Sequence, residues 1–263
     1  MDISTLFSLE GKIAVVTGGS RGIGKHFAKA FIQAGCAKVY ITARKAQACV
    51  DTAEELGPKC IPLPHDLSTL DGIDAFIADL KQHEDHVDIL INNAGAAWGE
   101  EYLQFSESGW DKTMDLNLKS PFFLTQKMHD MLKKNATAEE PSKVINIASI
   151  DGLRLNPWET YAYHASKSGL IYLTRRVAAK VLEDNILVNC IAPGAFASDM
   201  NRAARDHGDE VAKRIPLKRI GNGEDISAAA IYLAARSGNY VVGQTIAVDG
   251  GLVWATIGSS IDA

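Results

Sequence analysis

The sequence predicts an α/β fold: a single Rossmann-type domain with a doubly wound parallel sheet of about seven strands and helices on both faces. Short β-branched runs recur along all 263 residues and alternate with longer stretches of helical apolar spacing. This alternation is typical of β-α-β units, in which a helix connects two parallel strands. Most of the short runs are almost continuously apolar, as in strands that helices cover on both faces. Because no linker, charge block or internal repeat divides the chain, we expect one domain over residues 1–263.

The short apolar runs define the candidate strands. They are Ile13–Thr17, Lys38–Thr42, Cys60–Leu63, Ile89–Asn92, Val144–Ile147, Leu187–Ile191 and Thr245–Val248. A helix with one buried face is expected between the first two, on the spacing of Ile23, Phe27, Ala30, Phe31 and Ala34. Residues 133–143 and 198–216 lack such patterns and are expected to be surface excursions. The second of them is a candidate substrate lid.

Composition and charge narrow the function classes. With 46% hydrophobic and 22% charged residues, the chain has the composition of an ordinary globular protein. Its formal net charge of −5 argues against a nucleic-acid partner. The four cysteines lie far apart without metal-ligand spacing, which favours free thiols and predicts no metal site. Since neither a signal peptide nor a long apolar segment is visible, we expect a cytoplasmic protein that does not associate with membranes.

A glycine-rich turn follows the first predicted strand. The strand runs directly into TGGSRGIG, residues 17–24, and then into the expected helix. At such a strand-to-helix turn, this pattern is typical of dinucleotide binding, with the helix N-terminus facing the pyrophosphate. Gly18 and Gly22 permit a tight turn and close backbone approach, and Gly24 lets the helix pack near the strand. The alternative is a glycine-rich turn with a purely structural role.

The residues after the second strand favour NADP(H) over NAD(H). An NAD site usually has an Asp or Glu there that holds the ribose 2′-hydroxyl. This chain has Ala43 and Arg44 instead. Arg44, helped by Arg21 from the glycine turn and by Lys45, suits a 2′-phosphate through charge-assisted hydrogen bonds. Solvated surface arginines remain the alternative.

Tyr163 and Lys167 form a candidate proton-transfer pair. Four residues apart, they share one face of a helix, where the ammonium can stabilise a phenolate and lower the tyrosine pKa from about 10. Tyr161 lacks such a partner, because Ala165 occupies the corresponding position. Ser149 follows an apolar strand at its carboxyl end, where open parallel sheets place ligands. A tyrosine that only packs is the alternative.

Several motifs occur in a characteristic order along the chain. After TGGSRGIG come NNAG at 92–95, Ser149, YHASK at 163–167 and APG at 192–194. On these motifs, from near Leu9 to Gly251, the chain resembles the short-chain dehydrogenase/reductase family. Within it, the chain looks most like NADPH-dependent 3-oxoacyl reductases, including the rhamnolipid-associated type.

The resemblance implies roles for four residues in catalysis. Tyr163 protonates the alkoxide during hydride transfer, Lys167 also contacts the nicotinamide ribose, and Ser149 orients the substrate carbonyl. Asn117 matches the family's fourth catalytic position.

Asn117 lies in a predicted helix close to a proline. Pro121 has no N–H to donate to the Asn117 carbonyl, so we expect a kink there. We hypothesise that the freed carbonyl binds a water that relays protons to Lys167; a proline that simply ends the helix is the alternative. The expected apolar stripe of this helix is Trp110, Met114, Leu118 and Phe122.

The family pattern also assigns the remaining cofactor positions. Beyond the glycines, Arg21 and Arg44, they are Ser20, Ile23, Asp66, Leu67, Asn93, Ala94, Gly95, Tyr163, Lys167, Pro193, Gly194 and Ser198. The sequence departs from the pattern at Gly223, where proline is common, and in the tail 252–263. Candidates for an apolar substrate wall are Trp98, Leu155, Trp158 and Phe196, with generic core aromatics as the alternative.

Taken together, the sequence predicts one dinucleotide-binding and catalytic domain that reduces a ketone to a secondary alcohol with NADP(H). The preferred substrate is a 3-oxoacyl thioester or another small β-keto compound. Alternatives are a steroid, sugar, polyol or xenobiotic carbonyl, and an NADP-binding sensor or scaffold without turnover. The resemblance implies a homo-oligomer, commonly a tetramer.

Overall fold

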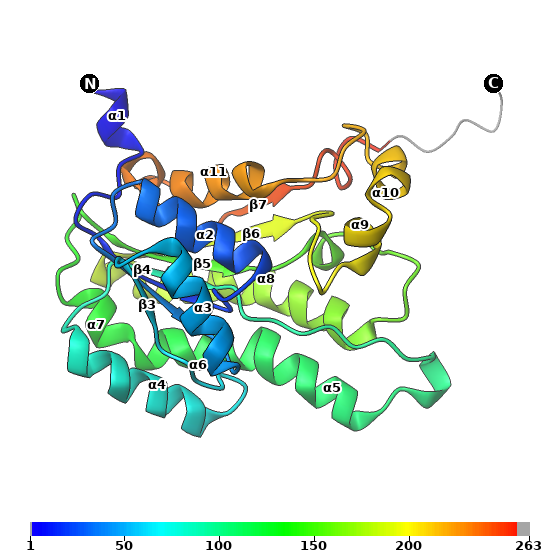
Figure 1. Ribbon diagram of the computed structural model, residues 1–263, viewed down its shortest axis with the longest axis horizontal. Helices are drawn as coiled ribbons and strands as arrows, with labels where there is room; N and C mark the ends of the chain where they lie inside the picture. The colour runs from blue at the N-terminus through cyan, green and yellow to red at the C-terminus, as the bar shows by residue number, and fades with distance from the viewer. Residues whose placement is uncertain (1, 257–263) are drawn as a thin grey trace.

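Seven parallel strands form one sheet in the computed structural model, which describes residues 2–256 (Figure 1). Their order across the sheet is β3-β2-β1-β4-β5-β6-β7, and each neighbouring pair runs parallel. The strands are β1 (Ile13–Thr17), β2 (Lys38–Thr42), β3 (Cys60–Pro62), β4 (Ile89–Asn92), β5 (Ser142–Ile147), β6 (Ile186–Pro193) and β7 (Thr245–Val248). The predicted doubly wound α/β fold is confirmed, and the predicted bounds of β1, β2, β4 and β7 match the structure.

The other three strands differ from the prediction at their ends. β3 ends one residue early, β6 extends to Pro193, and β5 begins at the polar Ser142 and Lys143. Strand pairing uses backbone groups, which polar residues supply equally well: the Lys143 N–H donates to the Asp88 carbonyl at 2.8 Å. A search for apolar runs therefore places the start of β5 too late.

Helices cover both faces of the sheet (Figure 1). One face carries α2 (Gly22–Gln33), α3 (Ala46–Leu56) and α11 (Gly223–Ala234). The opposite face carries α4 (Leu70–His83), α5 (Glu107–Met114), α6 (Ser120–Lys127), α7 (His129–Lys133) and α8 (Tyr161–Val181). Three short helices lie outside these layers. They are α1 (Ile3–Leu6), near the start of the described chain, and α9 (Arg202–Asp206) and α10 (Gly208–Arg214), both within residues 198–216.

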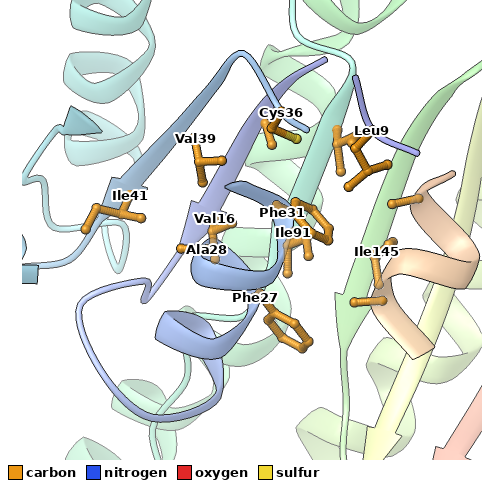
Figure 2. Close-up of a cluster of buried hydrophobic side chains, with 14 of the residues drawn as sticks. Leu9, Val16, Phe27, Ala28, Phe31, Cys36, Val39, Ile41, Ile91 and Ile145 are labelled. Atoms are coloured by element: carbon orange, nitrogen blue, oxygen red, sulfur yellow. The ribbon is translucent and has the colours of Figure 1, made fainter. Parts of the chain in front are cut away.

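Two hydrophobic clusters fill the spaces between the sheet and its helices. Successive residues of a strand point to opposite faces, so Val16 joins the cluster beneath α2 whereas Val15 joins the one beneath α4. Figure 2 shows the first cluster, in which Phe27 and Phe31 of α2 are completely buried. Burial of one such side chain contributes about 1.5–3 kcal/mol to folding. The predicted buried face of α2 is thus confirmed at Phe27, Ala30 and Phe31.

The strand order brings the predicted motifs to one edge of the sheet. β1 lies between β2 and β4, at the point where the order of strands reverses, and open α/β sheets bind ligands outside the carboxyl ends at such a point. The glycine turn follows β1 and the NNAG loop follows β4. Ser149 and Gly194 come after the neighbouring strands β5 and β6.

The first predicted surface excursion, residues 133–143, is wrong at its ends: Lys133 ends α7, and the buried residues Ser142 and Lys143 begin β5, so only residues 134–141 lie between these elements. Residues 198–216 contain α9 and α10, drawn in gold near the carboxyl end of β6 (Figure 1). Of the predicted tail 252–263, residues 257–263 lie outside the described residues. Within residues 2–256, no helix combines the length and apolar character that a bilayer-spanning segment needs.

Candidate active site

The glycine-rich turn between β1 and α2 packs against the loop that follows β4. Gly18 and Gly22 have φ angles of +65° and +54°, a left-handed conformation that favours glycine. A Cβ atom on Gly18 would lie only 2.9 Å from Asn93 Nδ2. One on Gly24 would lie 2.2 Å from the Gly18 carbonyl oxygen. The turn therefore requires glycine at these positions for the reasons the sequence suggested.

Thr17 and Asn93 hold the turn and the β4 loop together. The Thr17 hydroxyl accepts hydrogen bonds from the backbone N–H groups of Asn93 and Ala94, both at 2.9 Å. The Asn93 side-chain amide donates to the Thr17 carbonyl at 2.8 Å. These bonds bring Asn93 and Ala94 directly beside the glycine turn, with Gly95 next along the loop.

Arg44 and Arg21 lie on neighbouring loops. Thr42, at the end of β2, pairs with Thr17 of β1, and the Thr52 hydroxyl of α3 donates to the Ser20 carbonyl at 2.8 Å. Arg44 is exposed and makes no ion pair with any residue in 2–256. Arg21 is paired, because its NH1 lies 2.7 Å from Asp199 Oδ2. The sequence did not foresee this carboxylate partner.

The loop after β2 and the glycine turn fit a dinucleotide that carries a 2′-phosphate. The absence of side chains at Gly18 and Gly24 leaves the main chain of the turn accessible, and a Cβ at either position would collide with neighbouring atoms. Arg21 lies within the turn and Arg44 follows β2, and the two residues after β2, Ala43 and Arg44, include no carboxylate that would repel a phosphate. NADP(H), when bound, would be held by these groups.

The other proposed cofactor residues differ in burial and in their hydrogen-bond partners. The Asp66 carboxylate accepts hydrogen bonds from the Ser68 N–H and hydroxyl, at 3.0 and 2.7 Å. Leu67 is 3% exposed and packs in the core, which leaves only its main chain for a contact with adenine. Ser198 lies beside Gly22, 3.7 Å from the position of a Cβ there.

Three further proposed cofactor residues, Ile23, Pro193 and Gly194, lie where α2 begins or where β6 ends. Ile23 is half-buried against the core. Pro193 ends β6, and the Gly194 N–H donates to the Val248 carbonyl at 2.9 Å.

Ser149, Tyr163 and Lys167 meet at the carboxyl end of β5. Ser149 is 7% exposed and caps a 3₁₀ turn, its hydroxyl accepting from the Asp151 N–H at 3.1 Å. Tyr163 and Lys167 lie one turn apart on the same face of α8, with the Lys167 Nζ 5.6 Å from the centre of the phenol ring. Lys167 is 4% exposed and donates to the Ile147 carbonyl at 2.8 Å. The three side chains thus share one partly enclosed region.

Desolvation sets the pKa values of the two ionisable groups. It raises the pKa of Tyr163 to about 12, against a smaller lowering by the Ser149 hydroxyl. It lowers the pKa of Lys167 to about 8. The predicted lowering of the tyrosine pKa is wrong, because the ammonium points to a backbone carbonyl and both groups are withdrawn from water. At neutral pH the phenol is protonated, which is the form a proton donor requires.

Asn117 ties three parts of the site together. Its side-chain oxygen accepts from the Ala96 N–H at 2.8 Å, and its amide donates to the Ala96 carbonyl at 2.8 Å and to the Ser166 hydroxyl at 3.1 Å. The Ser166 hydroxyl donates in turn to the Tyr163 carbonyl at 2.8 Å. A Cβ on Gly95 would lie 3.2 Å from the Asn117 oxygen and 3.8 Å from the Lys167 ammonium. Asn117 therefore fixes the β4 loop against α8.

The helix around Asn117 changes its hydrogen-bond register before Pro121. Residues Asp115–Lys119 form a π-helical turn in which the Ser120 N–H donates to the Asp115 carbonyl, and α6 follows. The predicted irregularity is present as this turn, a common device at functional sites. A water on the Asn117 carbonyl stays a hypothesis.

The predicted apolar stripe of this helix borders a surface hollow. Trp110 is 41% exposed. Met114, Leu118 and Phe122 are half-buried and line an open hollow of about 320 Å³ together with Leu173, and Leu118 also packs against a small buried cluster that includes Leu170. The buried side of the helix carries Thr113, Asn117, Pro121 and Leu124. The apolar stripe is therefore present, on a side of the helix that stays partly exposed.

Comparisons with known proteins agree with this geometry. A family model described as enoyl-(acyl carrier protein) reductase matches residues 18–253. A rhamnolipid-biosynthesis 3-oxoacyl-[acyl-carrier-protein] reductase from Pseudomonas aeruginosa is 42% identical over 250 residues, 93% of this chain and 97% of the relative. The chain belongs to the short-chain dehydrogenase/reductase family. The predicted family and the prediction of an oxidoreductase are confirmed.

One further relative and a solved structure complete the comparison within the short-chain dehydrogenases/reductases. An Escherichia coli 2-dehydro-3-deoxy-D-gluconate 5-dehydrogenase is 40% identical over 258 residues, 95% of this chain and 98% of the relative. The solved structure of Pseudomonas aeruginosa RhlG, an active-site complex with NADP, has a TM-score of 0.91 and 41% identity, covering 94% of this chain and 98% of that one. The names of these relatives therefore allow either an acyl substrate or a sugar-acid substrate for this chain.

The candidate substrate wall of this short-chain dehydrogenase/reductase is only partly supported. Phe196 is 5% exposed and packs in the core against Gly221, so it is a core aromatic rather than a wall residue. Leu155 and Trp158 are 85% and 57% exposed on the loop that leads to α8. The half-buried Trp98 stacks on Gly109, with the Lys112 ammonium 4.5 Å from the centre of its ring.

Three functional contacts escaped sequence reasoning. Thr17 holds the β4 loop, Ser166 connects Asn117 to the backbone of Tyr163, and Asp199 binds Arg21. Thr17 belongs to TGGSRGIG and Ser166 to YHASK, so a hydroxyl side chain within each motif could have indicated a hydrogen bond there. Asp199 offered no such signal, because its partner is 178 residues away.

Proposed function

We propose that this enzyme uses NADP(H) to reduce the carbonyl of a 3-oxoacyl thioester to a secondary alcohol. The observation that carries this proposal is the grouping of a protonated, desolvated phenol, a buried lysine and a serine hydroxyl at one sheet edge. The glycine turn that suits a dinucleotide opens onto the same edge.

The residues divide the chemistry of a ketone reduction between them. NADP(H), when bound, supplies the hydride. The Ser149 hydroxyl donates a hydrogen bond to the substrate carbonyl oxygen, which draws electron density from the carbonyl carbon. Tyr163 donates its proton to that oxygen as the negative charge develops. The Lys167 ammonium, 5.6 Å from the ring centre, stabilises the phenolate that remains.

Asn117 acts through its neighbours. By holding Ala96 and Ser166, it keeps the loop after β4 and the second turn of α8 at a fixed separation. We therefore treat Asn117 as a positioning residue for Tyr163 and Lys167. The segment 198–216 remains our candidate lid over the site.

Exposed apolar side chains favour an acyl substrate over a sugar acid. Loops that leave the carboxyl ends of β4, β5 and β6 carry Leu103, Leu155, Trp158 and Met200, exposed by 91%, 85%, 57% and 51%. A hydrocarbon chain that covers part of this apolar surface gains about 25 cal/mol per Å² removed from water. A polyhydroxylated substrate gains no such contribution from these loops.

A substrate screen tests the proposal. NADPH oxidation would be followed with short- and long-chain 3-oxoacyl thioesters, a 2-enoyl thioester and unrelated ketones. NADP⁺ reduction would be followed with a 2-dehydro-3-deoxygluconate-type sugar acid. We expect kcat/KM to be highest for the 3-oxoacyl series and to rise with chain length. Turnover confined to the sugar acid or the enoyl thioester would contradict the proposal, and binding of NADPH without any turnover would support a sensor or scaffold.

We also propose a homo-oligomer. The half-buried apolar residues Met114, Leu118, Phe122 and Leu173 line an open surface hollow that a second copy can cover. Light scattering after size-exclusion chromatography should give a multiple of the 28.3 kDa chain mass, with four copies as the form expected from the family. A monomer mass at micromolar concentration would contradict this.

A further inference from the structure

Asp199 joins the glycine turn to the candidate lid. Its Oδ2 lies 2.7 Å from NH1 of Arg21, and its Oδ1 lies 2.8 Å from NH1 of Arg205 in α9. The preceding residue, Ser198, lies against Gly22 of the same turn and accepts a hydrogen bond from the Asn201 N–H at 3.1 Å. The segment 198–201 is therefore held against the turn at two adjacent residues.

Arg21 carries one of the two positive charges that suit a 2′-phosphate. In the ion pair with Asp199 that charge is neutralised, whereas Arg44 makes no ion pair with any residue in 2–256. The side chains of Arg21 and Asp199 are 68% and 54% exposed, so the guanidinium has room to turn from one anion to another. A phosphate that carries close to two negative charges attracts a guanidinium more strongly than a carboxylate does.

We propose that Asp199 weakens the preference of the protein for NADP(H) over NAD(H) by competing with the 2′-phosphate of NADP(H) for Arg21. The inference rests on the proposed function only in taking NADP(H) as the cofactor. Arg44 supplies a preference for the phosphorylated cofactor that does not depend on Asp199. The Asp199 carboxylate reduces that preference, because it occupies the second cation and adds a negative charge near the phosphate.

Arg205 has a second carboxylate partner besides Asp199. Its Nε and NH2 lie 2.7 and 3.0 Å from the two oxygens of Asp206. When Arg21 moves to a phosphate, Asp199 keeps Arg205, and α9 keeps its own ion pairs. The exchange thus requires movement of one exposed side chain and no rearrangement of the lid helices.

Binding of two nucleotide fragments tests this inference without catalysis. Adenosine 2′,5′-bisphosphate and 5′-AMP differ only in the 2′-phosphate and lack the nicotinamide, and calorimetry gives their dissociation constants. We expect Asp199→Asn to tighten bisphosphate binding by about two- to fivefold, as for other exposed ion pairs, and to leave 5′-AMP binding unchanged. Because salt screens exposed charges, the gain should shrink at high ionic strength.

Asp206→Asn provides a matched control. It removes a neighbouring carboxylate from Arg205 but has no contact with Arg21, so the ratio of the two affinities should stay at the wild-type value. In an Arg21→Gln background, Asp199→Asn should no longer change that ratio. Unfolding midpoints of all variants would establish that each one is folded.

Three results would overturn the inference. The first is an equal change in both affinities, and the second is an undiminished effect of Asp199→Asn without Arg21. The third is weaker bisphosphate binding in Asp199→Asn, which would make the carboxylate a support that orients Arg21 toward the phosphate. Failure of the proposed cofactor looks different, because the wild-type protein would then bind the bisphosphate no more tightly than 5′-AMP.

Discussion

Gly24→Ala tests whether the geometry of the glycine turn controls cofactor binding. The new Cβ would lie 2.2 Å from the Gly18 carbonyl oxygen, 2.5 Å from Asn93 Nδ2 and 2.8 Å from the Gly18 carbonyl carbon. Two of these atoms belong to the backbone, so no side-chain rotation relieves the clash. To reach the 3.4 Å at which ordinary contact begins, the carbonyl must move by about 1.2 Å.

A movement of this size affects both binding and stability. Hydrogen bonds weaken steeply outside a range of a few tenths of an ångström, so the turn should lose at least one charge-assisted bond to the pyrophosphate. Such a bond contributes about 1.5–3 kcal/mol, and its loss weakens NADPH binding roughly 10- to 100-fold. Overpacking of this kind costs a further ~1–3 kcal/mol of folding free energy.

Calorimetric titration with NADPH and urea unfolding measure these two effects. Gly208→Ala is the matched control, because a Cβ there meets only Ile220 Cδ1 at an ordinary 3.5 Å, and Gly208 begins α10 away from the turn. That variant should bind NADPH like the wild type. Binding by Gly24→Ala within twofold of the wild type would refute the assignment of this turn as the cofactor cradle.

Four other changes have defined outcomes. Tyr163→Phe should abolish turnover, since the ring remains but the proton donor is lost, and fluorescence titration should show nearly unchanged NADPH binding. The rate of ketone reduction in wild-type enzyme should fall as pH rises through about 8, because Lys167 then loses the charge that stabilises the phenolate; a flat kcat profile up to pH 10 would exclude that role. Arg44→Asp should weaken NADPH binding and improve use of NADH, as measured by the ratio of kcat/KM values, and an unchanged ratio would contradict the 2′-phosphate assignment. Phe31→Ala, at a completely buried position, should lower the free energy of unfolding by about 3–5 kcal/mol in urea titrations without changing the cofactor preference of the folded enzyme.

Local patterns were sufficient to identify most of the candidate site. A strand that runs into TGGSRGIG and then into an amphipathic helix has few other conformations, because Gly18 and Gly22 must adopt positive φ and Gly24 must lie against the Gly18 carbonyl. The spacing of Tyr163 and Lys167 places them on one helix face whatever surrounds the helix. Parallel strands all end at one edge, so Ser149 had to lie near both motifs.

Other features depend on surroundings that no local pattern contains. The spacing of Trp110, Met114, Leu118 and Phe122 identified an apolar stripe, but it did not show that the stripe borders a surface hollow and is only partly buried. Phe196 is aromatic, as expected of a residue in an apolar substrate wall, but in the structure it packs in the core.

The sequence by itself determined the strands, the positive-φ turn and the shared helix face of the candidate pair Tyr163 and Lys167, because each follows from backbone sterics or from spacing along one element. Only the tertiary structure decided the raised pKa of Tyr163, the partial exposure of the apolar stripe and the partner of Arg21. The reason is physical: desolvation and ion pairing depend on which distant segments come together, as with Arg21 and Asp199, and that information is distributed over the whole chain.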